Sequence, residues 1–274
     1  MSETSQEPIR LPWVHVVLAR PSEPRNVGAA CRAMKNFGIT RLSIVTGETL
    51  DYESARPLAV HADDLLERAR VVPTLAEAVE GASLVAGTTR RLGQKRKSVS
   101  LMPWEFAART TERFAASSLP GDDNDADSAS GGELAVVFGN EQSGLSDEEL
   151  LECHVAVSIP TSPLCPSLNL SHAVEVICYE LYKSAMRAFD TAADGGHAGG
   201  HPPGIAGAGV ATPIAAAHAD AIVRHLDALR FRSQEGPQGM RIFMRDLIAR
   251  AGLSYEEAER FERLFAKLAG MHGR

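Results

Sequence analysis

Short apolar runs alternate with amphipathic segments through the first 189 residues, and this alternation constrains the fold more than any other feature. The runs are short and rich in β-branched side chains, which is typical of buried strands. They occupy residues 13–19, 42–45, 84–87, 134–138 and 155–159. Strands that alternate with helices form a largely parallel sheet covered by those helices, so the sequence predicts an α/β domain.

Helical patterns fill the segments between these runs. Residues 26–37 place small and apolar side chains on one stripe, and Gly38 follows where a C-terminal capping residue is expected. Asn26 is a candidate N-cap for this helix. Further helices are predicted over residues 63–70, 74–79, 103–115 and 171–189. The last helix carries an apolar stripe formed by Val174, Ile177, Cys178, Leu181, Tyr182 and Ala185, which fits either a core or a surface between two copies of the chain.

A change in composition separates this region from the rest of the chain. Residues 190–212 contain seven glycines, two prolines and no lysine or arginine, which is typical of a flexible linker. Three helices are predicted beyond it, over residues 213–230, 238–251 and 254–268. The third opens with Ser254 and Glu257, the spacing of a capping box. We therefore predict a first domain at 1–189, a flexible Gly/Ala/Pro linker at 190–212 and a small all-helical domain at 213–274.

Composition and charge exclude several classes of protein. The chain is 44% hydrophobic and 23% charged, which is a globular composition. No apolar run reaches the ~18 residues that cross a bilayer. The four cysteines form no C-x-x-C pair, and the histidines form no ligand set. The net charge of −7 argues against a protein that coats nucleic acid by charge alone. We therefore expect a cytoplasmic protein that needs neither a membrane nor a metal.

Ligands bind at the carboxyl ends of parallel strands, so the loops that follow the strands are the candidate site. The loop after the first strand leads into Arg25, Asn26, Gly28 and Arg32. The two arginines lie about two helical turns apart, close enough to the helix N-terminus to reach an anion held there. A capping asparagine together with two surface arginines explains the same residues equally well.

Two later loops also have unusual compositions. Residues 139–145 form a glycine-bounded loop that presents Glu141 but matches neither a P-loop nor a G-x-G-x-x-G fingerprint. Residues 160–169 are rich in proline and include Ser167 and Asn169 just before a long helix. Capping that helix needs only one polar side chain, so the stretch favours a binding site.

Three segments resemble, in order and spacing, the motifs of the SpoU/TrmH-type ribose 2′-O-methyltransferases of the SPOUT superfamily. They read RNVGAACRAMKNFG, VVFGNEQSGLS and IPTSPLCPSLNLSHAVEVICYELY. The resemblance covers residues 11–189, and it is greatest to enzymes that methylate the ribose at position 32 of the tRNA anticodon loop. It implies a parallel-sheet domain with a deep trefoil knot near residues 134–175, followed by a helical domain that binds tRNA.

The resemblance also implies a cofactor, S-adenosylmethionine, held in the knot largely by backbone groups. The family's cofactor positions carry Thr88, Thr89, Arg90, Gly139, Ile159, Pro166, Ser167 and Leu168. Ile159 and Leu168 would enclose the adenine ring, and glycine at 139 would keep a side chain from crowding the ligand.

The family's catalytic positions carry Asn26, Arg32, Glu141, Ser167 and Asn169, with Arg25 beside them. Because arginine does not lose its proton in proteins, we expect Arg32 to orient the target phosphate and lower the pKa of the adjacent hydroxyl. Ser167 or Asn169 would hydrogen-bond to that hydroxyl. Glu141 would hold Asn26 or an arginine across the cleft.

The resemblance implies two partners, a tRNA substrate and a second copy of the chain. The tRNA backbone would contact Arg91, Lys95, Arg96 and Lys97, together with C-terminal cations such as Arg224, Arg230, Arg232, Arg241 and Arg245. The homodimer would form through the knot helices, with an arginine of one protomer reaching the cofactor of the other.

Several alternatives stay open. The basic stretch also fits a solvated loop. The catalytic domain also fits an enzyme of the same fold that acts on another tRNA position or on ribosomal RNA. The whole chain also fits a non-catalytic RNA-binding knot protein or an unrelated nucleotide-binding protein.

Overall fold

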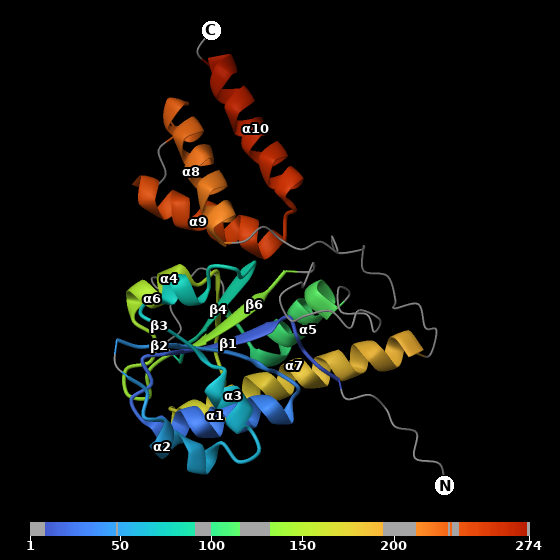
Figure 1. The fold of residues 1–274 in the computed structure, drawn as a ribbon. Helices are drawn as coiled ribbons and strands as arrows, with labels where there is room; N and C mark the ends of the chain where they lie inside the picture. The colour runs from blue at the N-terminus through green and yellow to red at the C-terminus, as the bar shows by residue number, and fades with distance from the viewer. Residues whose placement is uncertain are drawn as a thin grey trace.

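Figure 1 shows a computed structural model of the chain, which describes residues 9–47, 49–90, 100–115, 132–193, 212–229, 231 and 236–272. Some predicted RNA-binding residues lie outside these ranges, namely Arg91, Lys95, Arg96, Lys97, Arg230 and Arg232. Within the described ranges, no helix has both the length and the apolar character needed to span a membrane.

A seven-stranded sheet forms the centre of the first part of the chain, and all of its strand pairs are parallel. The strands are β1 (Val14–Ala19), β2 (Arg41–Val45), β3 (Arg70–Val72), β4 (Leu84–Thr88), β5 (Ser100–Leu101), β6 (Leu134–Phe138) and β7 (Val155–Val157). The predicted α/β class and parallel sheet are therefore confirmed. The sequence does not reveal β3 and β5, because strands this short carry no detectable periodicity.

Two strands from late in the chain lie inside the sheet. The order across the sheet is β3-β2-β1-β6-β4-β7-β5, so β6 lies between β1 and β4, and β7 lies between β4 and β5. Val16 of β1 pairs with Leu42 of β2 on one side and with Val136 of β6 on the other. Every residue of β6 is buried, as expected of a central strand covered on both faces.

Helices cover both faces of the sheet (Figure 1). One face carries α1 (Pro24–Asn36), α5 (Pro103–Phe114) and α7 (Leu170–Ala193), and the other carries α4 (Leu75–Ala78) and α6 (Asp147–Glu152). The short α2 (Tyr52–Ala55), the 3-10 helix η1 (Arg56–Leu58) and α3 (Asp63–Glu67) lie beside α1. Alternate residues of β1 face the two layers: Val16 and Leu18 pack against α1 and α7, whereas Val17 and Ala19 pack on the side of α4 and α6.

The first helix begins earlier than the sequence pattern predicts. α1 starts at Pro24, and Glu23 is its N-cap, with a carboxylate that accepts a hydrogen bond of 3.3 Å from the backbone N of Arg25. Asn26 is therefore not the cap, because proline is favoured in the first turn and Glu23 already supplies the capping oxygen. The Asn26 side chain is free to contact another segment. Gly38, with φ of +66°, follows the helix end as expected.

The apolar stripe of α7 belongs to the core of a single chain. Its members Val174, Ile177, Cys178, Leu181 and Ala185 are buried against the sheet layer, and Tyr182 is partly buried. α7 also continues to Ala193, so the first residues of the predicted linker are helical. Residues 194–211 of that linker lie outside the described ranges.

Three helices form the C-terminal part, as predicted. They are α8 (Thr212–Ala228), α9 (Gly236–Ala251) and α10 (Tyr255–His272). They share a small apolar core that includes Ile222, Ile248 and Ala258. The predicted capping box opens α10: Ser254 N donates to the Glu257 carboxylate at 2.9 Å, and Glu257 N donates to the Ser254 hydroxyl at 3.3 Å.

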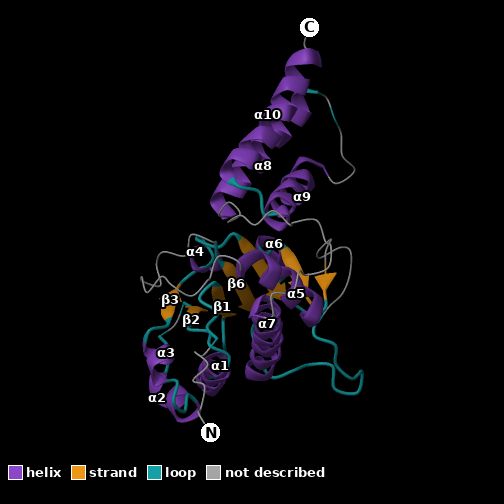
Figure 2. Cartoon of the chain, turned by 90° about the vertical axis from the view of Figure 1, so that its right-hand side faces the viewer, coloured by secondary structure: helices purple, strands orange, loops and turns teal. Residues whose placement is uncertain are grey.

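α9 lies against the first part of the chain, on the side of the sheet covered by α4 and α6 (Figures 1 and 2). Arg113 of α5 donates to the carbonyl of Ala249 in the last turn of α9 at 2.7 Å, and burial lowers the pKa of Arg113 to about 10. In the opposite direction, Arg245 of α9 donates to the carbonyl of Leu151 in α6. Cations interact favourably with helix C-termini. The Arg245 guanidinium, which we expected to bind tRNA, is therefore occupied within the chain.

Candidate functional site

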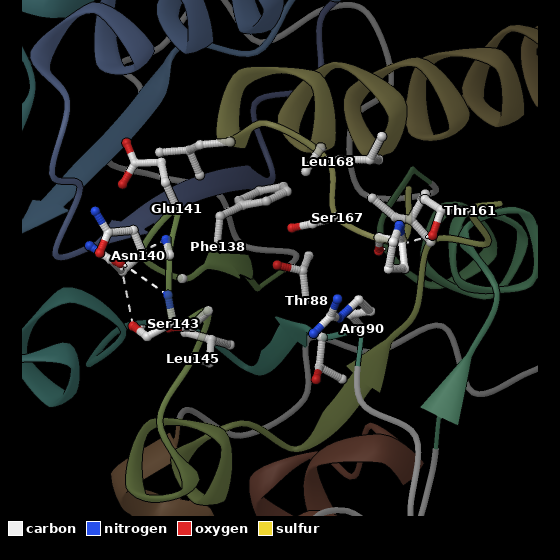
Figure 3. Close-up of a pocket in the computed structure, with 18 of the residues that line it drawn as sticks. Thr88, Arg90, Phe138, Asn140, Glu141, Ser143, Leu145, Thr161, Ser167 and Leu168 are labelled. Atoms are coloured by element: carbon white, nitrogen blue, oxygen red, sulfur yellow. Dashed lines mark hydrogen bonds between the residues drawn. The ribbon is translucent and has the colours of Figure 1, made fainter. Parts of the chain in front are cut away.

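A pocket opens at the carboxyl edge of the sheet, where β4, β6 and β7 end (Figure 3). Its lining comes from three segments far apart in sequence, residues 88–90, 138–145 and 157–173. All eight residues expected to hold a cofactor lie in it: Thr88, Thr89, Arg90, Gly139, Ile159, Pro166, Ser167 and Leu168. The fold thus gathers in one place the residues that the sequence motifs single out.

The pocket walls combine apolar and polar surface. Phe138, Leu145, Ile159 and Leu168 supply apolar walls. The Thr88 hydroxyl donates to the carbonyl of Val137 at 3.0 Å, so the polar side of the pocket is held by the sheet. Within the described ranges, no group of three or more His, Cys, Asp or Glu side chains is arranged to hold a metal ion.

The glycine-bounded loop after β6 closes on itself. A Cβ atom at Gly139 would lie 2.2 Å from backbone atoms of Gly144 and Leu145, so the loop admits only glycine there. We expected this glycine to make room for a ligand, but the returning loop occupies the space. Asn140 Oδ1 accepts a hydrogen bond of 2.9 Å from the backbone N of Gln142 and so stabilises the turn.

Three of the predicted catalytic residues form one hydrogen-bonded chain. Asn26 Nδ2 donates to Glu141 Oε1 at 2.8 Å, and Asn169 Nδ2 donates to Asn26 Oδ1 at 2.9 Å. Asn169 Oδ1 accepts hydrogen bonds from the backbone N and the hydroxyl of Ser171, at 2.9 and 2.7 Å. The expected contact between Glu141 and Asn26 is present. The chain fixes the start of α1, the loop after β6 and the start of α7 relative to one another.

Glu141 is an acceptor whose oxygens are already used. The backbone N and the hydroxyl of Ser22 both donate to its carboxylate at 2.8 Å, in addition to Asn26. Burial favours the neutral acid, but the hydrogen bonds from Ser22 and Asn26 outweigh it and lower the pKa of Glu141. Glu141 is therefore an anion at neutral pH that positions its neighbours rather than a base that takes a proton.

Ser167 and Asn169 differ in what their side chains can still bind. Ser167 is exposed at the pocket, and its hydroxyl forms no hydrogen bond to the described residues. Both ends of the Asn169 amide are bonded to the protein. Of the two residues expected to bond the reacting hydroxyl, Ser167 is the one whose polar group is available.

Arg25 and Arg32 lie on α1 and are both exposed. Neither belongs to the pocket lining of its own chain. Among the described residues, neither guanidinium has an ion-pair partner. Arg90, also exposed, is a cation in the lining itself. The structure therefore brings Asn26, Glu141, Ser167 and Asn169 to one site but leaves the two arginines of α1 outside it.

Arg20 and Glu149 support the pocket loop, and neither is a predicted site residue. Arg20 donates to both carboxylate oxygens of Glu149, at 2.7 and 2.6 Å, and its carbonyl accepts a hydrogen bond of 2.8 Å from Asn140 Nδ2. Arg20 has φ of +53°, which residues with side chains rarely adopt. Ser146 and Glu149 form the capping box of α6, and their spacing is the signal that reveals this helix. Nothing in the sequence pairs Glu149 with Arg20.

Comparison with known proteins gives matches over the region that contains this site. The SpoU rRNA Methylase family model matches residues 13–179. The tRNA (cytidine/uridine/adenosine-2′-O-)-methyltransferase TrmJ of Pseudomonas aeruginosa is 41% identical over 169 residues, which are 61% of this chain and 60% of that protein. The tRNA (cytidine-2′-O-)-methyltransferase TrmJ of Methanocaldococcus jannaschii is 36% identical over 176 residues, 64% of this chain and 69% of that protein.

A solved structure extends the similarity to nearly the whole chain. The crystal structure of TrmJ from Z. mobilis aligns with 93% of this chain and 98% of its own, with a TM-score of 0.63 and 25% identity. The P. aeruginosa relative, in contrast, is matched over about three fifths of its length. The family model spans more than half of the chain and all three loops of the pocket. The chain therefore belongs to the SpoU rRNA methylase family.

Proposed function

We propose that this protein transfers a methyl group from S-adenosylmethionine to the 2′-hydroxyl of a tRNA ribose, with the cytidine or uridine at position 32 as its target. The observation that carries the proposal is that one pocket gathers all eight cofactor positions of the family together with the Ser167 hydroxyl, which has no hydrogen-bond partner among the described residues. The choice of tRNA is supported by the relatives from P. aeruginosa and M. jannaschii, whose names describe tRNA 2′-O-methyltransferases.

The residues of the pocket suit S-adenosylmethionine. Ile159 and Leu168 are partly buried apolar side chains of the lining, as a flat purine ring requires. Arg90 is an exposed cation of the same lining that suits the carboxylate of the donor. When bound, the donor supplies a methyl group on a positively charged sulfur, which makes that methyl group an electrophile.

The protein acts mainly by positioning, because methyl transfer requires the nucleophile and the methyl group ~3 Å apart and aligned. Ser167 would hydrogen-bond to the ribose hydroxyl and hold it at the pocket. Arg32 would bind the adjacent phosphate through its planar fork and lower the pKa of the hydroxyl. The chain of Asn26, Glu141 and Asn169 keeps the segments that carry these groups in a fixed arrangement.

We further propose that the protein is a homodimer, and that Arg25 and Arg32 complete the pocket of the partner. Both arginines are exposed and lie outside the pocket of their own chain. Near them, α7 exposes Tyr179 and Met186, which are 48% and 42% accessible. The ring of Phe37 packs on Tyr179 at 5.9 Å, so α1 and α7 share an aromatic surface suited to a partner.

The contacts to tRNA are proposed from charge. Arg91, Lys95, Arg96 and Lys97 follow Arg90 directly in the sequence. Arg224 and Arg241 are exposed on the C-terminal helices, although Arg241 pairs with Asp220 at 3.0 Å. Cations of this kind bind phosphates and give affinity without reading sequence. A tRNA-modifying enzyme acts where tRNA is used, so we propose a cytoplasmic location.

We also propose that the backbone is knotted over residues 134–175, and that residues 1–189 and 213–274 are separate domains. The position of β6 between β1 and β4, and of β7 between β4 and β5, supports a knot, because each strand enters a space between strands made earlier. The separate apolar core of α8, α9 and α10 supports the division.

Ribosomal RNA is the second candidate substrate, because the matched family is named for rRNA methylation. The test supplies the purified protein with labelled S-adenosylmethionine and with either tRNA or ribosomal RNA, and then maps the labelled nucleotide. We expect label on the ribose at tRNA position 32, and none when that nucleotide is 2′-deoxy. Label on ribosomal RNA alone favours the second substrate. Calorimetry that finds ATP or NAD bound, and the methyl donor not bound, overturns the proposal.

A further inference from the structure

Two exposed apolar side chains follow strand ends at the edge of the sheet where the pocket opens, and the proposed reaction uses neither. Leu164 is 95% exposed and Trp104 is 52% exposed. They follow the carboxyl ends of the neighbouring parallel strands β7 and β5, in which Val157 pairs with Leu101. Ser158 N donates to the carbonyl of Leu101 at 2.9 Å, so the two segments start from the same point at the edge of the sheet.

The segment that carries Leu164 is held in place by its own hydrogen bonds. Thr161 Oγ1 donates to the carbonyl of Pro166 at 3.0 Å and closes the base of the segment. Leu164 N donates to the Ser162 hydroxyl at 3.2 Å, and Pro163 restricts the backbone between them. Thr161 and Pro166 both line the pocket. Leu164 is therefore presented to solvent by a braced loop at the pocket rim.

Trp104 is fixed in a similar way at the start of α5. Pro103 occupies the first helical position and is buried, and Phe106 is buried in the core. Met102 N donates to the Glu105 carboxylate at 3.0 Å, which stabilises the first turn. The indole thus extends from a rigid helix start, so little backbone entropy is lost when a ligand packs on it.

We propose that Trp104 is a stacking platform for an unpaired base of the RNA substrate, with Leu164 as an apolar contact beside it. The inference rests on the proposed function, because it names how that substrate is held. Proteins recognise single-stranded RNA loops by stacking splayed bases on aromatic side chains, and the contribution is large for each base. Phosphate contacts hold an RNA backbone but do not fix a base.

RNA fits this rim better than a protein partner does. Leu164 stands between Thr161 and Pro166 of the pocket lining, so a protein seated on it would obstruct the pocket that a ribose has to enter. The exposed Arg90 in the lining adds the positive charge that a polyanion requires.

Intrinsic fluorescence tests the proposal directly, because the chain has two tryptophans and the other one, Trp13, is only 2% exposed. We expect an anticodon stem-loop RNA to quench the emission of the full-length protein and to shield Trp104 from acrylamide. Trp104→Phe should show neither effect, since Trp13 is already buried. Trp104→Ala should weaken RNA binding about tenfold, whereas Trp104→Phe, which keeps an aromatic ring, should restore most of the affinity. Leu164→Ser should cause a smaller loss.

Two controls separate this inference from the proposed function. A stem-loop with abasic loop nucleotides keeps its phosphates and should bind without quenching, and calorimetry should find unchanged donor affinity in every variant. RNA that is bound and methylated without any change in Trp104 emission overturns the stacking role and leaves the function intact. A change in oligomeric state in Trp104→Ala, with RNA affinity unchanged, identifies the surface as a protein interface instead. A wild-type chain that binds neither donor nor RNA defeats the function itself.

Discussion

Asn26 donates a hydrogen bond of 2.8 Å to Glu141, although 115 residues separate the two. Asn26 belongs to the first turn of α1, and Glu141 to the loop that lines the pocket after β6. Asn169 joins them from the start of α7. The three sequence motifs are thus one connected unit in space, and a change at any member should reach the others.

Glu141→Gln should reduce both stability and turnover. The amide of glutamine turns an N–H donor toward the backbone N–H and the hydroxyl of Ser22, which both donate to the carboxylate in the wild type. Because a donor then lacks an acceptor, we expect a loss of about 1–3 kcal/mol in unfolding free energy at pH 7. The fold lowers the pKa of Glu141, so its stabilising contribution is complete above the pKa of the unfolded chain and is lost as pH falls through the lowered value. Urea unfolding should show a smaller drop in unfolding free energy between pH 7 and pH 4 for the variant than for the wild type.

Glu148→Gln is the matched control, because Glu148 is an exposed carboxylate of nearby α6. It should leave stability within about 0.5 kcal/mol of the wild type. Equal acid sensitivity of the Glu141 variant and the wild type would contradict the assignment.

Ser167→Ala and Asn169→Ala should separate chemistry from structure. Ser167 has no hydrogen bond to lose among the described residues, so its removal should lower kcat by about a hundredfold and leave the thermal midpoint unchanged. Asn169 accepts a hydrogen bond from Ser171 N at the start of α7, so its removal should cost about 1 kcal/mol of stability as well. Methyl-transfer kinetics and calorimetric melting check both. A Ser167 variant with full kcat would remove it from the reaction.

Arg32→Lys keeps the positive charge but loses the planar fork that binds a phosphate through two N–H groups. We expect kcat to fall at least tenfold while donor affinity stays the same, because the proposed partner of Arg32 is the phosphate of the substrate and not the methyl donor. Single-turnover assays with calorimetric donor titrations measure the two effects. Turnover equal to that of the wild type would show that charge alone suffices.

Gly139→Ala and Gly144→Ala compare two glycines of the same loop. The added methyl at Gly139 would lie 2.2 Å from backbone atoms, which cannot move aside as a side chain can. We expect a loss of about 2–4 kcal/mol and greatly weakened donor binding. Gly144 has φ of +69° with open space around it, so alanine there should cost only about 1–2 kcal/mol. Thermal melts of both variants test which loss of stability is larger. A smaller loss for Gly139→Ala than for Gly144→Ala would refute the steric argument.

A chain that ends after Ala193, where α7 ends, tests the role of the C-terminal helices. It should still bind the donor and dimerise, because the pocket and the exposed face of α7 remain. It should lose much of its tRNA affinity, since the cations of α8 and α9 are removed. Calorimetry, sedimentation and filter binding measure the three properties. Undiminished tRNA affinity would place recognition entirely in the first part of the chain.

The sequence predicts the fold where the elements are long and locally determined. The buried runs of β1 and β6 show β-branched character, and α10 shows its capping box, so both kinds of element are predictable. The predicted start of α1 is wrong because two nearby residues, Glu23 and Asn26, can each supply a capping oxygen. Short strands such as β3 and β5 leave too few residues for a period to appear.

The site is predictable only as far as motifs identify it. The family resemblance points to the residues of the pocket, including Ser167 and Gly139. It does not reveal that Arg20 binds Glu149, because such a pairing depends on the three-dimensional path of the chain. The reason for Gly139 is likewise visible only once the returning backbone is seen.

The strand order has a consequence for the newborn chain. β1 ends at Ala19, but its neighbour β6 begins only at Leu134. A ribosome that adds ~5–20 residues per second therefore needs on the order of ten seconds to make the missing neighbour. During that interval the backbone amide and carbonyl groups on one edge of β1 lack their native partners and can pair with strands of other nascent chains. Safe production of this protein thus depends on shielding its first strand while translation continues.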